Sequence, residues 1–325
     1  MKKRWIITGA NGYLGGQLCK KLHDLGEGIL GVTREGRSLK HLEDMNISCH
    51  RYAELPSILS NCDVFVHCAG KVGNRGTWDE FVKINRDWTL SLFKQAQEYG
   101  VSCFIYVSSV AALGYMTRPG RTNLDELSLP MHVKGEFYGR SKLLAEKALM
   151  GRVASGMTRL IILRPGLIYG RRPFVSSRSW FRRPVVVDSD QRVPLVHIDN
   201  FIAAVSEVAE HPEAQGVFHV VDEEQPTLSE LNALKMQFGI LRYSPWYIGK
   251  TGFWLLWFCR GINRILCGRI GENIKEYVLA EYYFHTRRLI YSTQKLRSQV
   301  GWTPSTHLES NLKEASTNPT ATEKI

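Results

Sequence analysis

The sequence predicts an α/β fold: a doubly wound parallel sheet with helices on both faces. Strand-like apolar runs alternate with longer amphipathic segments over the first two-thirds of the 325 residues. A glycine-rich turn, Gly9-x-x-Gly12-x-x-Gly15, directly follows the first apolar run and opens a helical segment. This context is typical of a Rossmann-type unit, in which the turn holds the pyrophosphate of a dinucleotide.

The strands are justified by short apolar runs with turn residues at their ends. A continuous apolar run such as Cys103–Ser108 indicates a central strand that is buried on both faces. The helices are justified by length and amphipathic pattern. In chain order, we expect a strand at Arg4–Thr8, a helix at Tyr13–Leu25, strands at Ile29–Thr33 and Asp63–Cys68, a helix at Asp79–Tyr99, a strand at Cys103–Ser108, a helix at Tyr138–Ala154, and strands at Leu160–Leu163 and Val217–Val221.

The pattern changes after residue 170, where basic turns such as Arg171-Arg172-Pro173 begin. We therefore expect a coenzyme-binding domain over residues 1–170, to which residues 194–222 return. Residues 171–325 would then form mainly a smaller, interleaved lobe that binds the substrate.

Composition narrows the possible partners and the compartment. The net charge of +11 is compatible with nucleic acid, an anionic membrane or an anionic substrate. Zinc-finger spacing and aromatic RNA-binding strands are missing from the sequence, so we expect no nucleic acid. The 7 cysteines are scattered without a Cys-x-x-Cys pair, which predicts reduced thiols, no metal site and a cytoplasmic protein. No apolar run is long enough to predict a membrane-spanning helix.

The glycine turn supplies most of the expected coenzyme contacts. Glycine lets the backbone approach the pyrophosphate, and the following helix offers unpaired N–H groups at its positive end. The expected binding residues there are Gly9, Asn11, Gly12, Tyr13, Leu14 and Gly15. After the second strand, Arg34 and Arg37 could pair with a 2′-phosphate, whereas Glu35 lies one position late for the acid that binds a ribose hydroxyl. This charge pattern favours NADP, with NAD as the alternative.

Tyr138 and Lys142 form a Tyr-x-x-x-Lys motif on one face of the expected helix. A tyrosine phenol with a pKa of about 10 is a poor acid or base at neutral pH. A nearby ammonium favours the phenolate and would lower that pKa. The expected strand before this helix ends in two serines, Ser108 and Ser109, whose side chains should face opposite sides.

In this order, the glycine turn, serine pair and Tyr-x-x-x-Lys motif resemble the extended short-chain dehydrogenase/reductase family, also called the NAD-dependent epimerase/dehydratase superfamily. The resemblance implies that Ser109 holds the substrate oxygen beside Tyr138 and that Lys142 also binds the nicotinamide ribose. It further implies that Asn85 supports a water near the lysine, although Asn85 could equally be an ordinary helix residue. The resemblance places five more residues beside the nicotinamide end: Cys68, Ala69, Gly70, Pro165 and Ile168.

The resemblance spans nearly the whole chain, with one departure. Segments Pro194–Asn200 and Thr293–Trp302 match later family signatures. Many relatives carry a Gly-Asp pair after the third strand, near the adenine, whereas this chain has His50-Arg51-Tyr52. Relatives often dimerise through the helices that correspond to Asp79–Tyr99 and Tyr138–Ala154, so we expect a homodimer.

Three functions remain open. The first is reversible hydride transfer between NADP(H) and a hydroxyl or ketone of a hydrophobic, sterol-like or long-chain substrate, as in enzymes similar to 3β-hydroxysteroid dehydrogenase and dihydroflavonol reductase. The second is a nucleotide-sugar epimerase or dehydratase that recycles NAD. Its diphosphate could be bound by four arginines: Arg178, Arg182, Arg183 and Arg192. The third is a non-catalytic, NADP-binding regulatory protein.

Segment Trp246–Ile270 is rich in large apolar residues and also carries arginines. Its spacing predicts an amphipathic helix. Such a helix could make peripheral contact with a membrane, line a pocket for a hydrophobic substrate, or pack on the core of the lobe.

Overall fold

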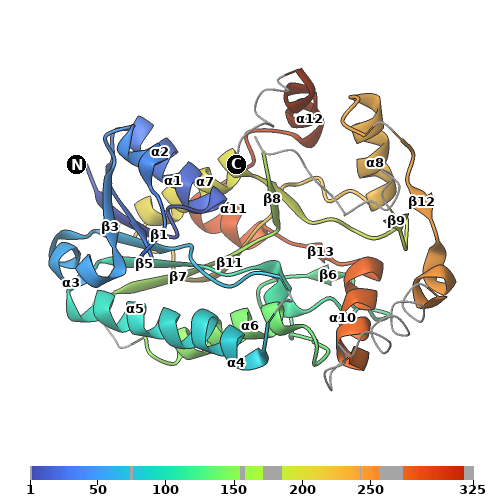
Figure 1. The fold of residues 1–325 in the computed structure, drawn as a ribbon, viewed down its shortest axis with the longest axis horizontal. Helices are drawn as coiled ribbons and strands as arrows, with labels where there is room; N and C mark the ends of the chain where they lie inside the picture. The colour runs from blue at the N-terminus through green and yellow to red at the C-terminus, as the bar shows by residue number, and fades with distance from the viewer. Residues whose placement is uncertain are drawn as a thin grey trace.

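A computed structural model describes residues 2–73, 76–153, 158–170, 185–241, 243–255 and 274–317. Its centre is a sheet of seven parallel strands in the order β11-β7-β5-β4-β1-β2-β3 (Figure 1). The strands are β1 (Arg4–Thr8), β2 (Gly28–Thr33), β3 (Ser48–Arg51), β4 (Val64–His67), β5 (Cys103–Val107), β7 (Arg159–Pro165) and β11 (Gly216–Val220). The predicted α/β class and parallel sheet are confirmed.

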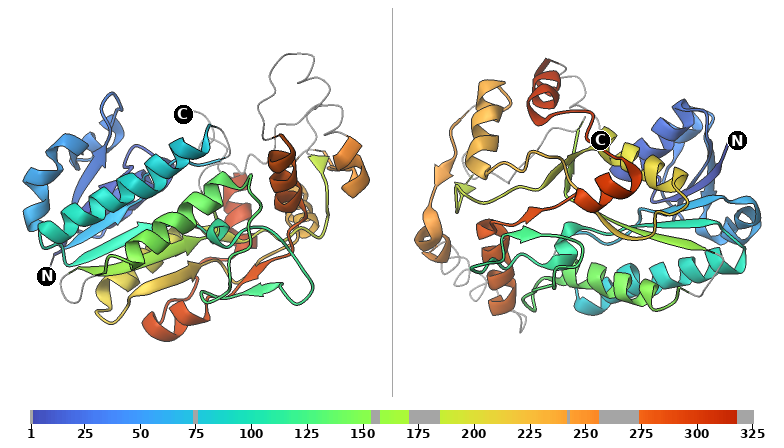
Figure 2. Two further views of the ribbon diagram at one scale, coloured as in Figure 1. Left: turned by 90° about the horizontal axis from the view of Figure 1, so that it is seen from below. Right: turned by 180° about the vertical axis from the view of Figure 1, so that it is seen from behind.

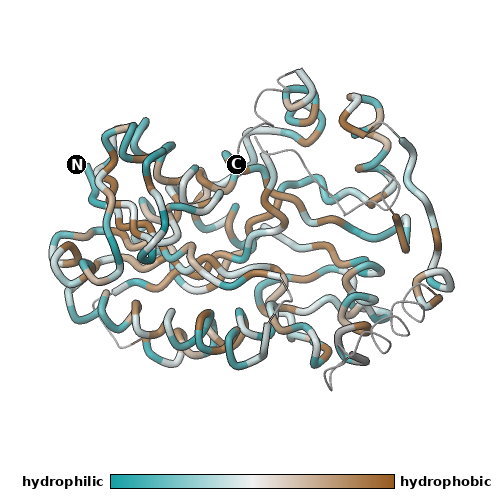
Figure 3. The backbone as a smooth tube through the Cα atoms, in the orientation of Figure 1, coloured by the Kyte–Doolittle hydropathy of each residue, from teal (hydrophilic) through white to brown (hydrophobic). Residues whose placement is uncertain are grey.

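Alternating side chains of the strands build two separate apolar cores. Trp5 and Ile7 of β1 face one core, and Ile6 faces the other. Helices α1 (Tyr13–Asp24) and α7 (Ile198–Glu210) cover the first face, whereas α5 (Trp88–Glu98) and α6 (Phe137–Met150) cover the second. Figure 2 shows α5 and α6 side by side across the strands, and Figure 3 shows the strongly hydrophobic strands between these helix layers.

The expected helix Asp79–Tyr99 is interrupted in the structure. Helix α4 (Trp78–Val82) begins at a capping box, in which the Thr77 side chain accepts from the backbone N–H of Glu80. A π-helical turn, Lys83–Asp87 (η3), then joins α4 to α5. The sequence pattern did not reveal this turn because the extra residue leaves the apolar spacing of each flanking helix intact.

The remaining strands form short pairs outside the central sheet. Two-stranded parallel pairs join β10 (Leu195–His197) to β8 (Leu167–Tyr169), β12 (Trp246–Tyr247) to β9 (Val185–Val186), and β13 (Ile290–Tyr291) to β6 (Asn123–Leu124). The other helices are α2 (Lys40–Glu43), α3 (Leu55–Ile58), α8 (Leu228–Gln237), α10 (Ile274–Thr286), α11 (Gln294–Val300) and α12 (Leu308–Thr317), with short 3₁₀ turns at Tyr52–Glu54, Leu59–Asn61 and Val110–Leu113.

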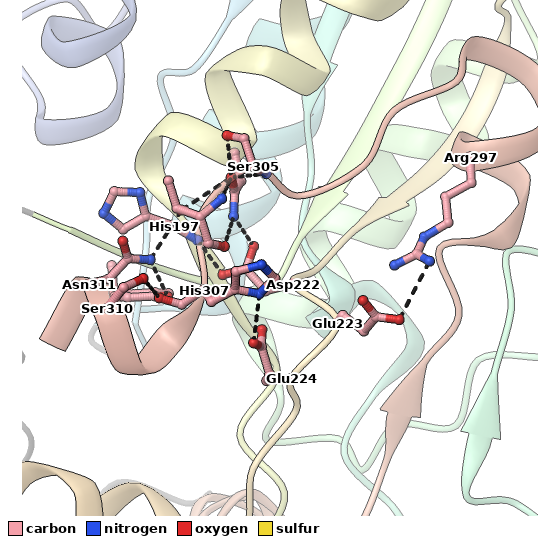
Figure 4. A network of polar contacts seen from close by, with 12 residues as sticks. His197, Asp222, Glu223, Glu224, Arg297, Ser305, His307, Ser310 and Asn311 are labelled. Atoms are coloured by element: carbon pink, nitrogen blue, oxygen red, sulfur yellow. Dashed lines mark hydrogen bonds and ion pairs between the residues drawn. The ribbon is translucent and has the colours of Figure 1, made fainter.

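A polar network fixes the C-terminal segment against α7 (Figure 4). The Asn200 side chain is fully buried and donates to Asp222 Oδ1 over 2.7 Å. Its Oδ1 atom accepts from the backbone N–H groups of Ser305 and Thr306, at 3.0 and 3.2 Å. Asn200 therefore joins the helix behind the sheet to the chain that leads into α12.

The expected single helix at Trp246–Ile270 is wrong at its start. Trp246 and Tyr247 form strand β12, and in the described part of the segment only residues 249–255 are helical. Phe253 is buried, whereas Trp254 stacks on Tyr282 of α10 with ring centroids 5.3 Å apart. Pairing of β12 with β9 outweighs the helical spacing there, and residues 256–273 lie outside the described residues.

Candidate active site

The glycine turn has the shape needed to hold a dinucleotide. Gly9 has φ +71°, a conformation that favours glycine, and its carbonyl oxygen accepts from the N–H of Gly12 at 2.8 Å. A Cβ atom on Gly15 would lie 2.4 Å from the same oxygen. Helix α1 then begins at Tyr13 without a side-chain cap at Gly12, so its first amides are available to an anion. The residues present fit a dinucleotide pyrophosphate.

Three arginines lie near the ends of β2 and β3. Arg34 and Arg37 are exposed after Thr33, whose hydroxyl donates to the Asn11 side chain at 2.7 Å. Thr33 is paired with Arg51 in the parallel register, and Arg51 Nη1 donates to the Arg37 carbonyl oxygen at 2.7 Å. In the sequence, Arg51 stands out only as a departure from the family pattern. Because β2 and β3 are parallel, their carboxyl ends lie at the same edge of the sheet, and this brings Arg51 close to Arg37.

The structure brings Ser109 and Tyr138 together and separates Ser108 from them. Tyr138 lies in the first turn of α6, and the Ser109 hydroxyl is near enough to its phenol to favour the phenolate. Ser109 also caps the short helical turn after β5 by accepting from the Ala111 N–H at 3.2 Å. Ser108 faces the opposite side and donates to Glu146 Oε1 at 2.5 Å. The structure therefore places Ser109, and not Ser108, on the side of the phenol.

Lys142 is buried one helical turn after Tyr138. Its Nζ donates to the Val107 carbonyl oxygen at 2.7 Å and lies 6.0 Å from the Tyr138 ring centroid. Burial lowers the pKa of Lys142 to about 8. Burial also raises the pKa of Tyr138, and the nearby Ser109 hydroxyl offsets this only in part. The sequence predicts that Lys142 lowers the pKa of Tyr138. In the protein without coenzyme the pKa is raised instead, because the removal of the phenol from water has the larger effect.

Asn85 and the segment after β4 complete the surroundings of Lys142. Asn85 is 1% exposed, and its amide group bonds both the N–H of Lys71 at 2.7 Å and the carbonyl oxygen of Lys71 at 2.9 Å. A Cβ atom on Gly70 would lie 3.1 Å from Asn85 Oδ1 and 3.5 Å from Lys142 Nζ. Asn85 thus holds the chain after Cys68-Ala69-Gly70 close to the lysine.

Other expected coenzyme residues meet at the same edge of the sheet. Tyr13, Leu14, Cys68 and Ile168 all pack against the core cluster on the α1 face. Pro165 is the last residue of β7, immediately after Arg164.

A buried ion pair lies beneath this region. Arg164 Nη2 lies 2.7 Å from Glu146 Oε2, and the two side chains are 5% and 0% exposed. Glu146 follows Lys142 by one helical turn and, as described above, also accepts from Ser108. The ion pair therefore joins the end of β7 to α6, on the side of the helix that carries Lys142.

The arginines proposed to bind a diphosphate are described only in part. Arg178, Arg182 and Arg183 lie outside the described residues. Arg192 Nη1 donates to the Gln225 carbonyl oxygen at 2.9 Å. Within the described ranges, no group of three or more His, Cys, Asp or Glu residues is arranged to hold a metal ion.

A glycine turn on a parallel sheet, with a Ser-Tyr-Lys set at the strand ends, defines a Rossmann-fold, NAD-binding oxidoreductase. Comparison with known proteins identifies the family. The chain belongs to the NAD dependent epimerase/dehydratase family, whose profile matches residues 5–222. The predicted family resemblance is confirmed.

Curated relatives include enzymes with different substrates. The chain is 28% identical over 250 residues to UDP-glucose 4-epimerase of Vibrio cholerae, covering 71% of this chain and 74% of that protein. It is 27% identical to sterol-4-alpha-carboxylate 3-dehydrogenase, decarboxylating, of Dictyostelium discoideum, covering 68% and 72%. It is 24% identical to 2-alkyl-3-oxoalkanoate reductase of Stenotrophomonas maltophilia, covering 95% and 97%.

Solved structures agree with the fold. UDP-glucose 4-epimerase from Thermotoga maritima has a TM-score of 0.72 at 18% identity, with 97% of each chain covered. UDP-glucuronic acid 4-epimerase from Bacillus cereus, in complex with NAD, has a TM-score of 0.71 at 16% identity, with 97% of this chain and 99% of that chain covered. Among the helices in the described part of the chain, none is both long and apolar enough to cross a bilayer.

Proposed function

We propose that the protein transfers hydride reversibly between NADP(H) and a hydroxyl or ketone of a hydrophobic, sterol-like or long-chain substrate. The observation that carries the proposal is the position of the Tyr138 phenol next to the Ser109 hydroxyl at the strand ends, with the Lys142 ammonium one helical turn away and 6.0 Å from the Tyr138 ring centroid. Such a set can bind a carbonyl or hydroxyl oxygen and exchange one proton with it.

Each residue has a distinct part in this chemistry. The Ser109 hydroxyl orients the substrate oxygen toward the Tyr138 phenol. In the direction of reduction, the phenol donates its proton to that oxygen. Its raised pKa keeps the phenol protonated at neutral pH. Lys142 stabilises the phenolate that forms, through its positive charge. A bound nicotinamide coenzyme would supply the hydride, or accept it in the reverse direction.

The arginines after β2 support the choice of NADP. Arg34 and Arg37 are exposed, and no salt bridge pairs either one with a carboxylate in the described part of the chain. Both can therefore approach a 2′-phosphate. Arg51 holds the carbonyl of Arg37 and so limits the positions that this loop can take.

The hydrophobic substrate is supported by several curated relatives. Their names include a sterol-4-alpha-carboxylate dehydrogenase, a 2-alkyl-3-oxoalkanoate reductase and a dihydroflavonol 4-reductase. The active-site side of the chain also carries aromatic groups: Tyr115 packs edge-on against Phe284 of α10, with ring centroids 5.2 Å apart. We assign the segment after residue 170, apart from the returning strands, to the lobe that covers this substrate.

The test is turnover of purified protein with NADPH and a panel of apolar ketones, including steroid and long-chain β-keto compounds. Tyr138→Phe should lose turnover and keep its NADPH affinity, because the phenol acts on the substrate. Tyr99→Phe, an exposed position, is the matched control and should retain activity. A fully active Tyr138→Phe enzyme would contradict the assigned chemistry.

A nucleotide-sugar epimerase is the second candidate, and one observation favours it. The Arg287 guanidinium is 5% exposed, lies 4.1 Å from the Phe284 ring centroid and 5.3 Å from that of Tyr115, and has no salt bridge among the described residues. A buried cation of this kind could pair with a phosphate. Conversion of UDP-glucose to UDP-galactose without added coenzyme, combined with no activity on apolar ketones, would select this candidate.

A further inference from the structure

Five buried polar side chains form a line through the coenzyme-binding part of the molecule. Thr8, His67 and Ser141 are 0% exposed, and Asn85 and Thr89 are 1% exposed. They come from β1, β4, the π turn, α5 and α6. Burial of so many polar groups is costly unless all are hydrogen-bonded, so their partners are informative.

The first half of the line has a defined direction. The Thr89 hydroxyl donates to the Asn85 carbonyl oxygen at 2.8 Å, so its single proton is used. It therefore accepts from His67 Nε2, which lies 3.0 Å away. His67 Nδ1, 2.7 Å from the Thr8 hydroxyl, must then accept from Thr8. Burial lowers the pKa of His67 to about 3, so this neutral tautomer persists at physiological pH.

The second half continues in the same direction. The Asn85 amide nitrogen donates to Ser141 Oγ at 2.9 Å, and the Ser141 hydroxyl donates to the Tyr138 carbonyl oxygen at 2.8 Å. The line therefore runs from Thr8, the residue before Gly9, to the backbone of Tyr138. Each bond is donated in this direction, and at Asn85 the line passes from the backbone carbonyl, which Thr89 binds, to the side chain, which binds Ser141.

The π turn makes the junction at Asn85 possible. Asn85 is the central residue of this turn. Its side chain faces Ser141 and the chain at Lys71, while its carbonyl oxygen is bound by Thr89 one turn later. Single π turns inside helices are frequent at functional sites, because the added residue turns the side chains around it.

We propose that Thr8, His67, Thr89 and Ser141 are positioning residues, which link the glycine turn to the catalytic helix so that coenzyme binding at the turn orders Tyr138 and Lys142. The inference rests on the proposed function, which gives Tyr138 and Lys142 their catalytic roles. The line gives the two sites a continuous physical connection, in which two runs of buried hydrogen bonds are joined through the covalent frame of Asn85.

The first test is a double-mutant cycle on kcat. Thr8→Val and Ser141→Ala each break the line at one end, and they share no hydrogen-bond partner. Each should lower kcat by about ten- to a hundredfold, because small displacements of reacting groups have effects of this size. The double variant should be no slower than the slower single variant. Multiplied losses would overturn the proposal, because independent sites combine in that way.

A matched control uses the neighbouring strand. Thr33 is 1% exposed at the end of β2, and its hydroxyl donates to Asn11 rather than into the line. Thr33→Val combined with Ser141→Ala should therefore give multiplied losses. If the losses of this control pair also fail to multiply, the effect comes from general loosening of the fold and not from the line.

The second test requires no substrate. NADP⁺ should slow hydrogen exchange of the backbone amides in residues 138–142 of the wild-type protein and of Thr89→Ser, which keeps the hydroxyl. In Thr89→Val the coenzyme should still bind, but this protection should fall about tenfold, in step with the kcat loss expected for a broken line. Equal protection in all three proteins would overturn the link. Missing turnover with intact exchange coupling would instead count against the proposed function.

Discussion

The ammonium nitrogen of Lys142 lies 2.7 Å from the carbonyl oxygen of Val107, the last residue of β5. This bond joins α6 to the strand that leads into Ser109. The two halves of the candidate active site are therefore fixed to each other by a catalytic group. Changes at Lys142 should alter the placement of the serine as well as the charge near Tyr138.

The pH dependence of reduction should follow Lys142. Because burial lowers the pKa of Lys142 to about 8, its ammonium loses the proton as the pH rises through that value. The Tyr138 phenol, whose pKa is raised, stays protonated over the same range. We expect kcat for ketone reduction to be level between about pH 6 and 7.5 and to fall above about pH 8. A pH–rate profile checks this, and a level rate up to pH 9.5 would contradict it.

Coenzyme preference should depend on Arg34. Arg34→Asp should weaken NADPH binding roughly tenfold or more and leave NADH binding nearly unchanged, since hydrogen bonds between charged groups contribute about 1.5–3 kcal/mol. Calorimetric titration of both coenzymes measures the two affinities. Lys94→Asp, an exposed change on α5, is the charge-matched control. Tighter binding of NADH than NADPH by the wild-type protein would exclude the arginine argument.

Arg51 should also contribute to the preference for NADPH over NADH, but less than Arg34. Its guanidinium bonds the Arg37 carbonyl oxygen, so Arg51→Leu releases the loop without removing Arg34. We expect a loss of NADPH affinity smaller than that of Arg34→Asp, by the same titration. An unchanged affinity would show that the loop needs no support from β3.

The buried Glu146–Arg164 pair predicts a clear pattern of stability. Arg164→Met leaves the Glu146 carboxylate buried without its cation and should lower the free energy of unfolding by about 3–5 kcal/mol. Arg164→Met combined with Glu146→Leu removes both charges and should recover most of this loss. Urea unfolding followed by circular dichroism measures both. A double variant no more stable than Arg164→Met would contradict the desolvation argument.

We expect a homodimer that uses the outer faces of α5 and α6, which lie side by side on one face of the sheet. Leu143 and Leu144 on α6 are only partly buried in the single chain. Isologous pairing would cover them. Light scattering should give twice the mass of the chain, and Leu144→Lys should give a monomer. A monomeric wild-type protein at micromolar concentration would refute the expectation.

We predict that the described residues of the segment Trp246–Ile270 make peripheral contact with a membrane. Trp254 and Leu255 are 47% and 66% exposed, and Lys250 lies on the same short segment. The protein should therefore sediment partly with anionic vesicles at low salt and be released by salt, since surface charge attraction is screened. Trp254→Glu with Leu255→Glu should abolish sedimentation. Equal sedimentation of the wild type and this variant would show that the segment makes no contact with the membrane.

The parallel sheet and the coenzyme turn could be predicted because their signals are local. The spacing of Gly9, Gly12 and Gly15 and the apolar strands each report on nearby residues only. These two predictions required no knowledge of distant contacts. Alternation along a strand indicates that Ser108 and Ser109 face opposite sides, but it does not say which one faces Tyr138, and the choice of Ser109 came from the family resemblance.

The missed features depend on contacts between distant residues. The π turn at Asn85 is stabilised by bonds to Lys71 and Ser141, which no helical pattern contains. Strand β12 exists because Trp246 pairs with Val185, far away in the sequence. The raised pKa of Tyr138 reflects the partial removal of its phenol from water by the fold, whereas the motif shows only its charged neighbour.

The order of the strands has a consequence for synthesis of the chain. Strand β7 ends at Pro165, but the strand that covers its outer edge, β11, begins only at Gly216. While the ribosome makes the residues between them, the apolar sequence Arg-Leu-Ile-Ile-Leu-Arg-Pro of β7 presents an unpaired edge. A nascent chain paused in this interval, or a fragment cut at residue 170, is therefore exposed to edge-to-edge association and depends on chaperones until β11 arrives.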